Sequence, residues 1–213
     1  MKLYTNKLDH PLYYFPAIVR EFVQANNIET VVVSEEEQAT DAFKAKRQHG
    51  KFPMLELDDG SMIYESAAIA FYIARQSASH GAALVGHNAF EEAQINQWVF
   101  ANAGNWAHAG AIMYNTLGMA YNMDAYNAAV KGIKEQAKTL NTHLQGKTFL
   151  VGQRLTIADI ANFLPMSMAF AFVLDAGFRK AMPNVSDWFA RVAAQSCVIN
   201  ACGVRKMCEK PLK

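Results

Sequence analysis

Short β-type runs alternate with a helical periodicity at the start of the chain. Residues 2–5 predict a first strand, and the β-branched run 30–34 predicts a short, buried second strand. The apolar residues between them recur at the three- and four-residue spacing of one helix face: Leu12, Phe15, Ile18, Val19, Phe22 and Val23. This order of strand, helix and strand predicts two parallel strands joined by a right-handed crossover.

Two prolines bear on where the first helix begins. Pro11 suits the first helical turn, where the missing N–H of proline costs no hydrogen bond. Pro16 lies inside the periodic pattern, so the helix either starts later or is kinked at that position.

The next stretch predicts a polar helix, a hairpin and a further helix. Residues 35–50 are mostly polar and predict one short, exposed helix that ends at Gly50, a residue type common at helix C-caps. The apolar runs 54–57 and 61–64 flank Asp58-Asp59-Gly60, which is a hairpin turn signal. An alanine-rich helical segment follows, and the order becomes βαβαββα.

The pattern changes after residue 77, and no further strand is predicted. Residues 78–88 are rich in small residues and predict a linker between a first domain, 1–77, and a second domain, 89–213. The second domain is predicted to be all-α, with helices over Phe90–Leu117, Asp124–Leu144, Ile157–Phe172 and Val185–Gln195. The predicted fold class is therefore α/β followed by all-α.

Composition and charge narrow the class of protein. With 213 residues, of which 52% are hydrophobic, the chain can form two modest packed domains or one large one. A net charge of +1 argues against non-specific nucleic-acid binding and against a polybasic membrane patch. No secretory signal and no apolar run of about 18 residues is found, so we expect no membrane insertion. Three cysteines near the C-terminus fit no zinc spacing, and we expect reduced thiols, no metal and a cytoplasmic location.

Glu65 and Ser66 place a carboxylate and a hydroxyl side by side where the alanine-rich helix begins. The first amide groups of a helix lack partners, and the helix dipole is positive there. One hypothesis is that either side chain caps the helix, which would contribute about 1 kcal/mol. The other is that the amides and the Ser66 hydroxyl bind a ligand carboxylate, while Glu65 accepts from the ligand's ammonium group.

Phe52-Pro53 favours the second hypothesis. A proline directly before a strand is compatible with a cis bond. Such a bond would turn the backbone N–H and C=O of Phe52 outward, where an extended peptide could pair with them. Together with Glu65 and Ser66, this predicts a site for a small peptide with a free α-amino acid end.

Two segments resemble the glutathione transferase family. Residues 50–74, GKFPMLELDDGSMIYESAAIAFYIA, resemble its signature in the thioredoxin-like domain. Residues 149–160, FLVGQRLTIADI, resemble its capping-box segment, in which Thr156 and Asp159 begin a buried helix. The resemblance covers essentially the whole chain and implies the glutathione transferase fold, a thioredoxin-like domain followed by an all-helical domain.

A narrower resemblance involves residues 97–119, 178–195 and 205–213. These are similar to the transferase-like domain of the elongation factor 1 gamma family. The lysine-rich linker and further domain of that family are not present here, so the resemblance implies an isolated or truncated N-terminal domain. It implies a scaffold that docks the nucleotide-exchange subunit of the elongation factor 1 complex, and a homodimer. The alternative is an active glutathione S-transferase, and the two functions need not exclude each other.

The resemblance also implies a binding site for glutathione or a glutathione-derived thiol such as trypanothione. Lys51 falls where related transferases place a lysine near the glycyl carboxylate, and His49 is a weaker candidate of the same kind. The predicted substrate-binding residues are His49, Lys51, Phe52, Pro53, Glu65 and Ser66.

The position that activates the thiol differs from the family pattern. Thr5 and Asp9 fall where family members carry a tyrosine or a serine, and Tyr4 should point into the core. An anion at Asp9 would disfavour the thiolate, although His10 could partly replace the missing donor and Asp9 could instead cap the first helix. The catalytic residue is therefore unknown, and any transferase activity is expected to be weak.

The helix after the linker also departs from the family. Many members bind glutathione partly through an acid on this helix of the other subunit, but here Asn102 and Asn105 occupy the region. Aromatic and methionine side chains on the same helix either line an apolar substrate pocket or pack in a core or dimer interface. These are Trp98, Trp106, Tyr114 and Met119.

Overall fold

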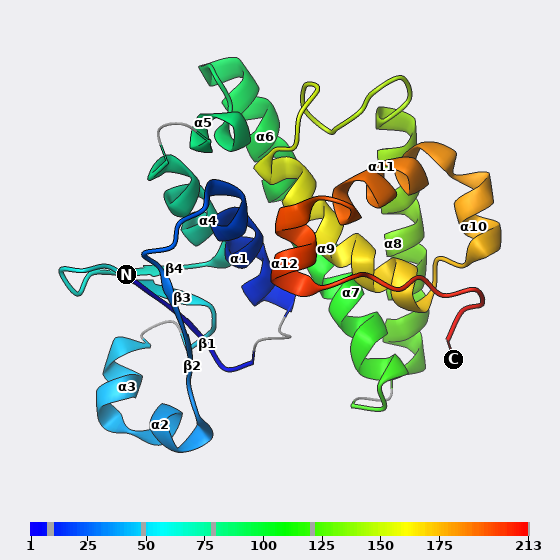
Figure 1. Ribbon diagram of the computed structural model, residues 1–213. Helices are drawn as coiled ribbons and strands as arrows, with labels where there is room; N and C mark the ends of the chain where they lie inside the picture. The colour runs from blue at the N-terminus through cyan, green and yellow to red at the C-terminus, as the bar shows by residue number, and fades with distance from the viewer. Residues whose placement is uncertain (8–10, 48–49, 78–79, 120–121, 213) are drawn as a thin grey trace. The chain divides into compact units, whose positions relative to one another are not determined.

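The computed structural model describes residues 1–7, 11–47, 50–77, 80–119 and 122–212 (Figure 1). The chain divides into two compact units. One comprises residues 1–85 together with 196–202, and the other comprises residues 86–195 together with 203–213. Among the described residues, no helix combines the length and the apolar character needed to cross a membrane.

The first unit is a four-stranded sheet with helices packed on it. Its elements are β1 (Lys2–Thr5), α1 (Pro11–Val23), β2 (Glu29–Val32), α2 (Glu35–Ala39), α3 (Asp41–Lys46), β3 (Met54–Glu56), β4 (Met62–Tyr64), α4 (Ser66–Arg75), α5 (Gly81–Val85) and α12 (Ser196–Cys202). The strand order is β2-β1-β3-β4. Strands β1 and β2 are parallel, as predicted. Strand β3 is antiparallel to β4, as the hairpin turn predicts, and it is also antiparallel to β1.

Helices α1 and α4 pack against each other, and α12 lies against α1 (Figure 1). Helix α1 begins at Pro11 and continues through Pro16, so the later start considered above is wrong. The buried side chains of α1 include Phe15, Ile18 and Val19, which belong to the predicted apolar face. The sequence patterns did not predict α5, which lies within the expected linker, or α12, which joins the first unit from far along the chain.

Two predictions for the first unit are corrected by the structure. Strand β2 lies at the edge of the sheet, and the Val32 side chain is 50% exposed, so this strand is not buried. The polar segment forms two helices, α2 and α3, instead of one. Thr40 separates them because its backbone is extended and its hydroxyl accepts a hydrogen bond from the Phe43 N–H at 3.2 Å.

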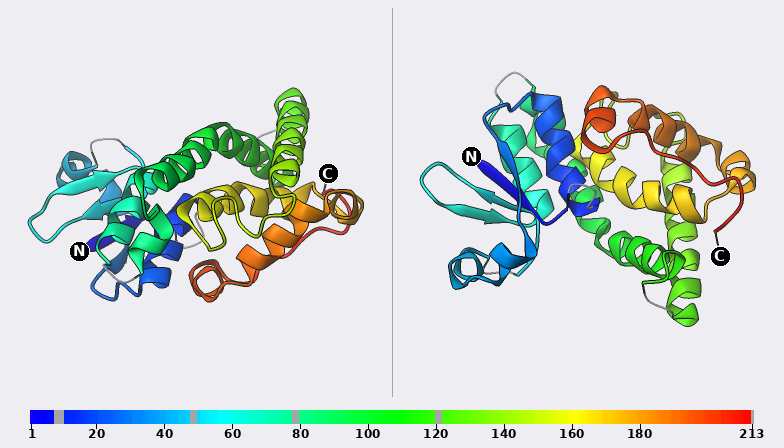
Figure 2. Two further views of the ribbon diagram at one scale, coloured as in Figure 1. Left: turned by 90° about the horizontal axis from the view of Figure 1, so that it is seen from above. Right: turned by 60° about the horizontal axis from the view of Figure 1, so that its bottom comes forward.

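The second unit contains only helices among its described residues. They are α6 (Ala89–Ala101), α7 (Ala103–Thr116), α8 (Met123–His143), α9 (Ile157–Phe172), α10 (Ala176–Ala181) and α11 (Pro183–Ala193). Helix α9 contacts α6, α7, α8 and α11, and both views of Figure 2 show it between the α6–α7 pair and α11. Every residue from Ile157 to Phe170 is buried, as expected of a helix that is apolar on all sides.

The long helix predicted over Phe90–Leu117 is two helices, α6 and α7. They meet at Asn102, which is almost fully buried and whose side-chain amide donates to the Ala161 carbonyl in α9. The Asn102 N–H donates to the Val99 carbonyl three residues earlier, so the chain tightens here. A polar anchor to the central helix therefore interrupts a pattern that looks continuous in sequence.

The predicted capping box at the start of α9 is formed. One carboxylate oxygen of Asp159 accepts from both the N–H and the hydroxyl of Thr156, each at 2.9 Å. The other oxygen accepts from the Leu150 N–H and from Nε1 of Trp188, again at 2.9 Å. This buried carboxylate therefore links the start of α9 to the preceding loop and to α11.

Candidate functional site

One hollow in the first unit brings together most of the predicted binding residues. It has a volume of about 110 Å³ and is lined by Leu12, Lys51, Phe52, Pro53, Tyr64, Glu65 and Ser66. The remaining predicted residue, His49, lies outside the described residues. The hollow is smaller than the roughly 300 Å³ of a pocket that encloses a small molecule. It can therefore take an end group of a ligand, but not a whole tripeptide.

The sheet register explains why these residues meet. Met54 on β3 pairs with Tyr64 on β4 in antiparallel register. The residue before Met54 is Pro53, and the residue after Tyr64 is Glu65, so the register places the two predicted segments beside each other. Residues 12 positions apart thus become neighbours through the hairpin.

The loop before β3 is anchored by the side chain of Phe52. The Phe52-Pro53 bond is cis, as proposed from the sequence. The Phe52 ring is buried in a cluster with Tyr4, Phe43 and Met54, and its centroid lies 6.0 Å from that of Phe43. Since the side chain points into the core, the loop is held at the edge of the hollow by apolar packing.

Glu65 has an unusual backbone conformation at the start of α4. Its φ of 68° lies in the left-handed region, which costs a residue with a side chain about 1 kcal/mol or more. Its side chain makes no capping hydrogen bond and is exposed. The capping hypothesis therefore does not describe Glu65, and its carboxylate remains accessible at the edge of the hollow.

The candidate thiol-activating hydroxyl of Thr5 is buried. Its Oγ1 donates to the Lys7 carbonyl at 2.8 Å and accepts from the Lys7 N–H at 3.3 Å. This local turn occupies the hydroxyl, so Thr5 does not offer it to a ligand. Asp9 and His10 lie outside the described residues, and their roles stay predictions.

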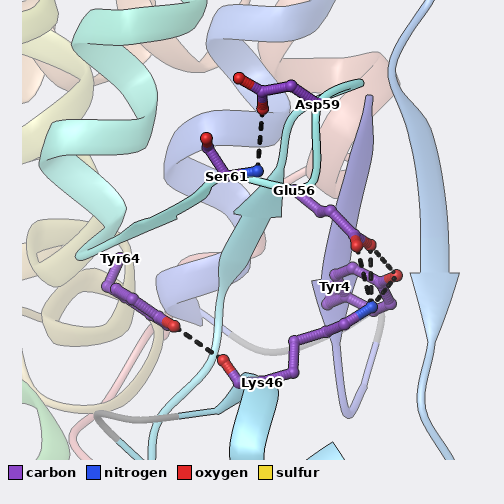
Figure 3. A network of polar contacts seen from close by, with 6 residues as sticks. All are labelled: Tyr4, Lys46, Glu56, Asp59, Ser61 and Tyr64. Atoms are coloured by element: carbon purple, nitrogen blue, oxygen red, sulfur yellow. Dashed lines mark hydrogen bonds and ion pairs between the residues drawn. The ribbon is translucent and has the colours of Figure 1, made fainter.

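Tyr4 points into the core, as predicted, and joins a polar network that the sequence analysis missed (Figure 3). Its hydroxyl donates to the Glu56 carboxylate. Lys46 Nζ donates to the two Glu56 oxygens at 2.9 and 3.0 Å and to the Tyr4 hydroxyl at 3.4 Å. Two strands, β1 and β3, and one helix, α3, supply these groups from positions far apart in the sequence, so no local motif could reveal them.

The network fixes the charge of its members. The hydrogen bond from Tyr4, together with Lys46, holds the pKa of Glu56 below its ordinary value despite partial burial. The hydrogen bond to Glu56 raises the pKa of Lys46, and burial raises the pKa of Tyr4. At neutral pH the network is therefore an ion pair bridged by a neutral tyrosine.

Comparison with known proteins assigns the family. Residues 9–81 match the family described as "Glutathione S-transferase, N-terminal domain", and residues 99–196 match "Glutathione S-transferase, C-terminal domain". The chain belongs to the glutathione S-transferase superfamily. Its thioredoxin-like sheet and all-helical second unit confirm the predicted glutathione transferase fold.

A curated relative places the chain more narrowly in this superfamily. Elongation factor 1-gamma of Rattus norvegicus is 36% identical over 173 residues, which cover 80% of this chain and 38% of the relative. The chain is therefore homologous to the transferase-like part of elongation factor 1-gamma. It spans about two fifths of the length of that relative.

Two solved structures agree on the fold. The GST-like domain of elongation factor 1-gamma from Saccharomyces cerevisiae superposes with a TM-score of 0.84 at 20% identity, covering 100% of this chain and 97% of that one. A glutathione S-transferase domain-containing protein from Marinobacter aquaeolei has a TM-score of 0.76 at 26% identity, covering 93% of this chain and 100% of that one.

The asparagines that occupy the family's acidic region have a structural role. Asn102 and Asn105 are both buried, and the Asn105 side chain donates to Oδ1 of Asn102 at 2.9 Å. They hold α6 and α7 to α9. Of the aromatic and methionine set in this region, Trp98 packs on the ring of His143, whereas Tyr114 and Met119 are 45% and 64% exposed. Core packing therefore does not explain the whole set.

The cysteines form no reactive or metal-binding cluster in the part of the chain that is described. Cys197, Cys202 and Cys208 are buried, and none of the three forms a disulfide bond. Burial raises the pKa of Cys197 to about 11, which suppresses its thiolate. Among the described residues, no three His, Cys, Asp or Glu side chains lie together so that they could hold a metal ion.

Proposed function

We propose that this chain acts as the transferase-like scaffold domain of an elongation factor 1 gamma subunit. In this role it docks the nucleotide-exchange subunit during translation elongation in the cytoplasm. The observation that carries the proposal is the 36% identity with rat elongation factor 1-gamma. The buried, hydrogen-bonded hydroxyl of Thr5 supports a scaffold over an efficient enzyme.

Binding to the purified nucleotide-exchange subunit tests this role. We expect a complex that co-elutes in size-exclusion chromatography at micromolar concentrations. A glutathione S-transferase that is not part of the elongation factor complex serves as the control and should not co-elute. Chromatography of the chain alone, with its mass measured by light scattering, tests the homodimer that the family resemblance implies. Separate elution of the two subunits at every concentration would contradict the scaffold role.

We further propose that the domain retains a site for glutathione or a glutathione-derived thiol. The exposed Glu65 carboxylate, which makes no capping bond, would accept from the α-ammonium group of the ligand. The first amides of α4 and the Ser66 hydroxyl would bind its α-carboxylate. The hollow matches the size of such an end group, and the loop at Phe52 lies beside it.

Glu65→Ala tests this site. Alanine also carries a Cβ, so the strain at φ 68° is retained and the change removes the carboxylate alone. A charge-assisted hydrogen bond contributes about 1.5–3 kcal/mol, so affinity for immobilised glutathione should fall by about ten- to a hundredfold. Glu35→Ala, at an exposed carboxylate on α2, is the matched control. Unchanged retention of a folded Glu65→Ala variant would exclude the assignment.

The second candidate function is catalysis by the same site, that is, a glutathione S-transferase. The observation that favours it is the hollow itself, because it is lined by an exposed carboxylate, Glu65, and by the first residue of α4, Ser66. Turnover with a model electrophile distinguishes the two functions, and both hold if the protein turns over substrate and binds the exchange subunit.

A further inference from the structure

Strand β2 has one unpaired edge. It is the first strand in the sheet order, with β1 as its neighbour on one side, and no described strand pairs with its other side (Figure 1). The N–H groups of Glu29 and Val33 donate to carbonyl oxygens on the β1 side. Because this direction alternates along a strand, Thr30 and Val32 direct their N–H and C=O groups away from the sheet.

The middle of this edge is held in place by a side chain. Thr30 Oγ1 lies 2.8 Å from the Tyr13 hydroxyl and accepts a hydrogen bond from the Arg20 guanidinium at 2.6 Å. Both partners belong to α1, so this helix fixes the backbone of β2. A segment that pairs with the edge therefore meets a strand that is already ordered, which lowers the entropy lost on binding.

The two faces of β2 differ in chemistry. Val31 packs against the apolar cluster that includes Phe43 of α3, so the side chains of Val31 and Glu29 lie on the face of the sheet that α3 covers. Val32 lies on the opposite face and is half exposed. An added strand would thus have a carboxylate beside one of its faces and an exposed valine beside the other.

Carboxylates stand at both ends of β2. Glu29 is its first residue, and residues 35–37, all glutamate, begin α2 three residues after its end. All four are exposed, and none is part of an ion pair among the described residues. Lys2 lies opposite Glu29 in the register and Arg47 donates to Gln38 on α2, so the chain itself can balance two of these charges. Two negative charges remain in excess.

This charge selects between possible occupants of the edge. A second copy of the chain would bring two sets of carboxylates together, and like charges placed opposite each other destabilise a strand pair. Charged residues are one means by which native sheets prevent pairing with themselves. The same carboxylates attract a segment that carries lysine or arginine.

We propose that the edge of β2 binds an extended, basic segment of a partner protein as a fifth strand of the sheet. The outward backbone groups of Thr30 and Val32 make the hydrogen bonds. Lysine or arginine side chains at alternate positions face Glu29 and the start of α2, and the β-branched residues between them lie beside Val32. This surface is separate from the hollow at Glu65 and does not depend on the binding of a thiol.

An end-capped, fluorescein-labelled peptide of alternating lysine and valine tests the proposal. Fluorescence anisotropy with the whole chain should show binding that weakens as salt is added, because salt screens exposed charges. The same peptide with glutamate in place of lysine is the control and should not bind. Hydrogen exchange should show that the lysine peptide protects the amides of Thr30 and Val32, a measurement that needs no variant.

Val32→Pro tests the backbone pairing itself. Proline removes one outward N–H, and the hydrogen bonds between β2 and β1 do not use that group. Loss of one hydrogen bond should weaken binding of the lysine peptide by about two- to tenfold. Val32→Thr is the matched control, because it keeps the N–H and the β-branched shape, and its affinity should equal that of the wild type.

The contrary outcomes are distinct. Equal binding of the lysine and glutamate peptides, or of neither, would overturn the proposal. So would unchanged affinity of a folded Val32→Pro variant, or no protection of Thr30 and Val32. If both amides are protected without peptide and Val32→Pro lowers the mass measured by light scattering, a second copy of the chain occupies the edge and the basic segment is excluded.

Discussion

Replacing Asp159 with alanine removes the acceptor for four buried hydrogen bonds. The donors are the N–H of Leu150, the N–H and hydroxyl of Thr156, and Nε1 of Trp188, each at 2.9 Å. Both Thr156 and Asp159 have no exposed surface, and Trp188 is fully buried as well. Water therefore cannot readily replace the lost carboxylate.

The expected loss of stability follows from these contacts. Each buried donor left without a partner costs about 1–3 kcal/mol. The variant also removes the free-energy cost of burying the carboxylate, which partly offsets this loss. That cost is seen in the pKa of Asp159, which burial raises and the hydrogen bonds lower. Removing one partner of a buried network typically costs about 3–5 kcal/mol. We expect the free energy of unfolding to fall by that amount, a large part of the 5–15 kcal/mol typical of a domain.

Urea denaturation followed by tryptophan fluorescence measures the effect. All three tryptophans, Trp98, Trp106 and Trp188, lie in the second unit, so the signal reports the unit that contains α9. With a slope of about 2 kcal/mol per molar, the urea midpoint should fall by roughly 2 M. Asp124→Ala, an exposed aspartate in the first turn of α8, is the control and should cost only a few tenths of a kcal/mol. A midpoint shift no larger than that of the control would refute the reasoning.

Gly81→Ala should destabilise the first unit by about 1–3 kcal/mol, because a Cβ there would lie 1.6 Å from the Ala74 carbonyl oxygen. Gly104→Ala has open space around the new Cβ and should instead stabilise the protein by up to about 1 kcal/mol. Thermal unfolding of the two variants measures both effects. Glu56→Gln should destabilise the protein most at neutral pH and progressively less below pH 4.5. The reason is that the pKa of Glu56 is lowered in the folded state, and the stability this contributes is lost as the pH falls. A difference in urea midpoint between wild type and variant that stays constant across this pH range would contradict the prediction. Asp9→Ser should lower the pKa of the bound thiol from about 8.5 and raise the rate of conjugation by about tenfold for each pKa unit. Rapid wild-type turnover with an apparent pKa near 6 would show that Asp9 does not repel the thiolate.

Local signals in the sequence were sufficient wherever neighbouring residues decide the structure. The turn at Asp58-Asp59-Gly60, the capping box of Thr156 and Asp159, and the apolar helix 157–172 were all predicted and are present. A turn or a helix start depends on backbone conformation and hydrogen bonds within a few residues. For the same reason, the Glu65-Ser66 segment could be recognised at the beginning of α4 before its surroundings were known.

Long-range contacts decided what these local signals left open. The pattern from Phe90 to Leu117 reads as one helix, yet it divides at Asn102, which is tied to Ala161 in α9. The run 30–34 predicts a buried strand. In the sheet order β2-β1-β3-β4, however, β2 is the first strand and lies at the edge.

At the candidate site, the sequence by itself determined which residue types are available, and the tertiary structure decided which of them can reach a ligand. Tyr4 and Thr5 are adjacent in sequence and both carry a hydroxyl. The Thr5 hydroxyl is hydrogen-bonded to the backbone of Lys7, whereas the Tyr4 hydroxyl binds Glu56 and Lys46. Successive side chains of a strand point to opposite faces, and the elements packed on each face decide what each hydroxyl binds. The pairing of Met54 with Tyr64, fixed by backbone hydrogen bonds across the hairpin, is what brings Pro53 next to Glu65 and creates the hollow.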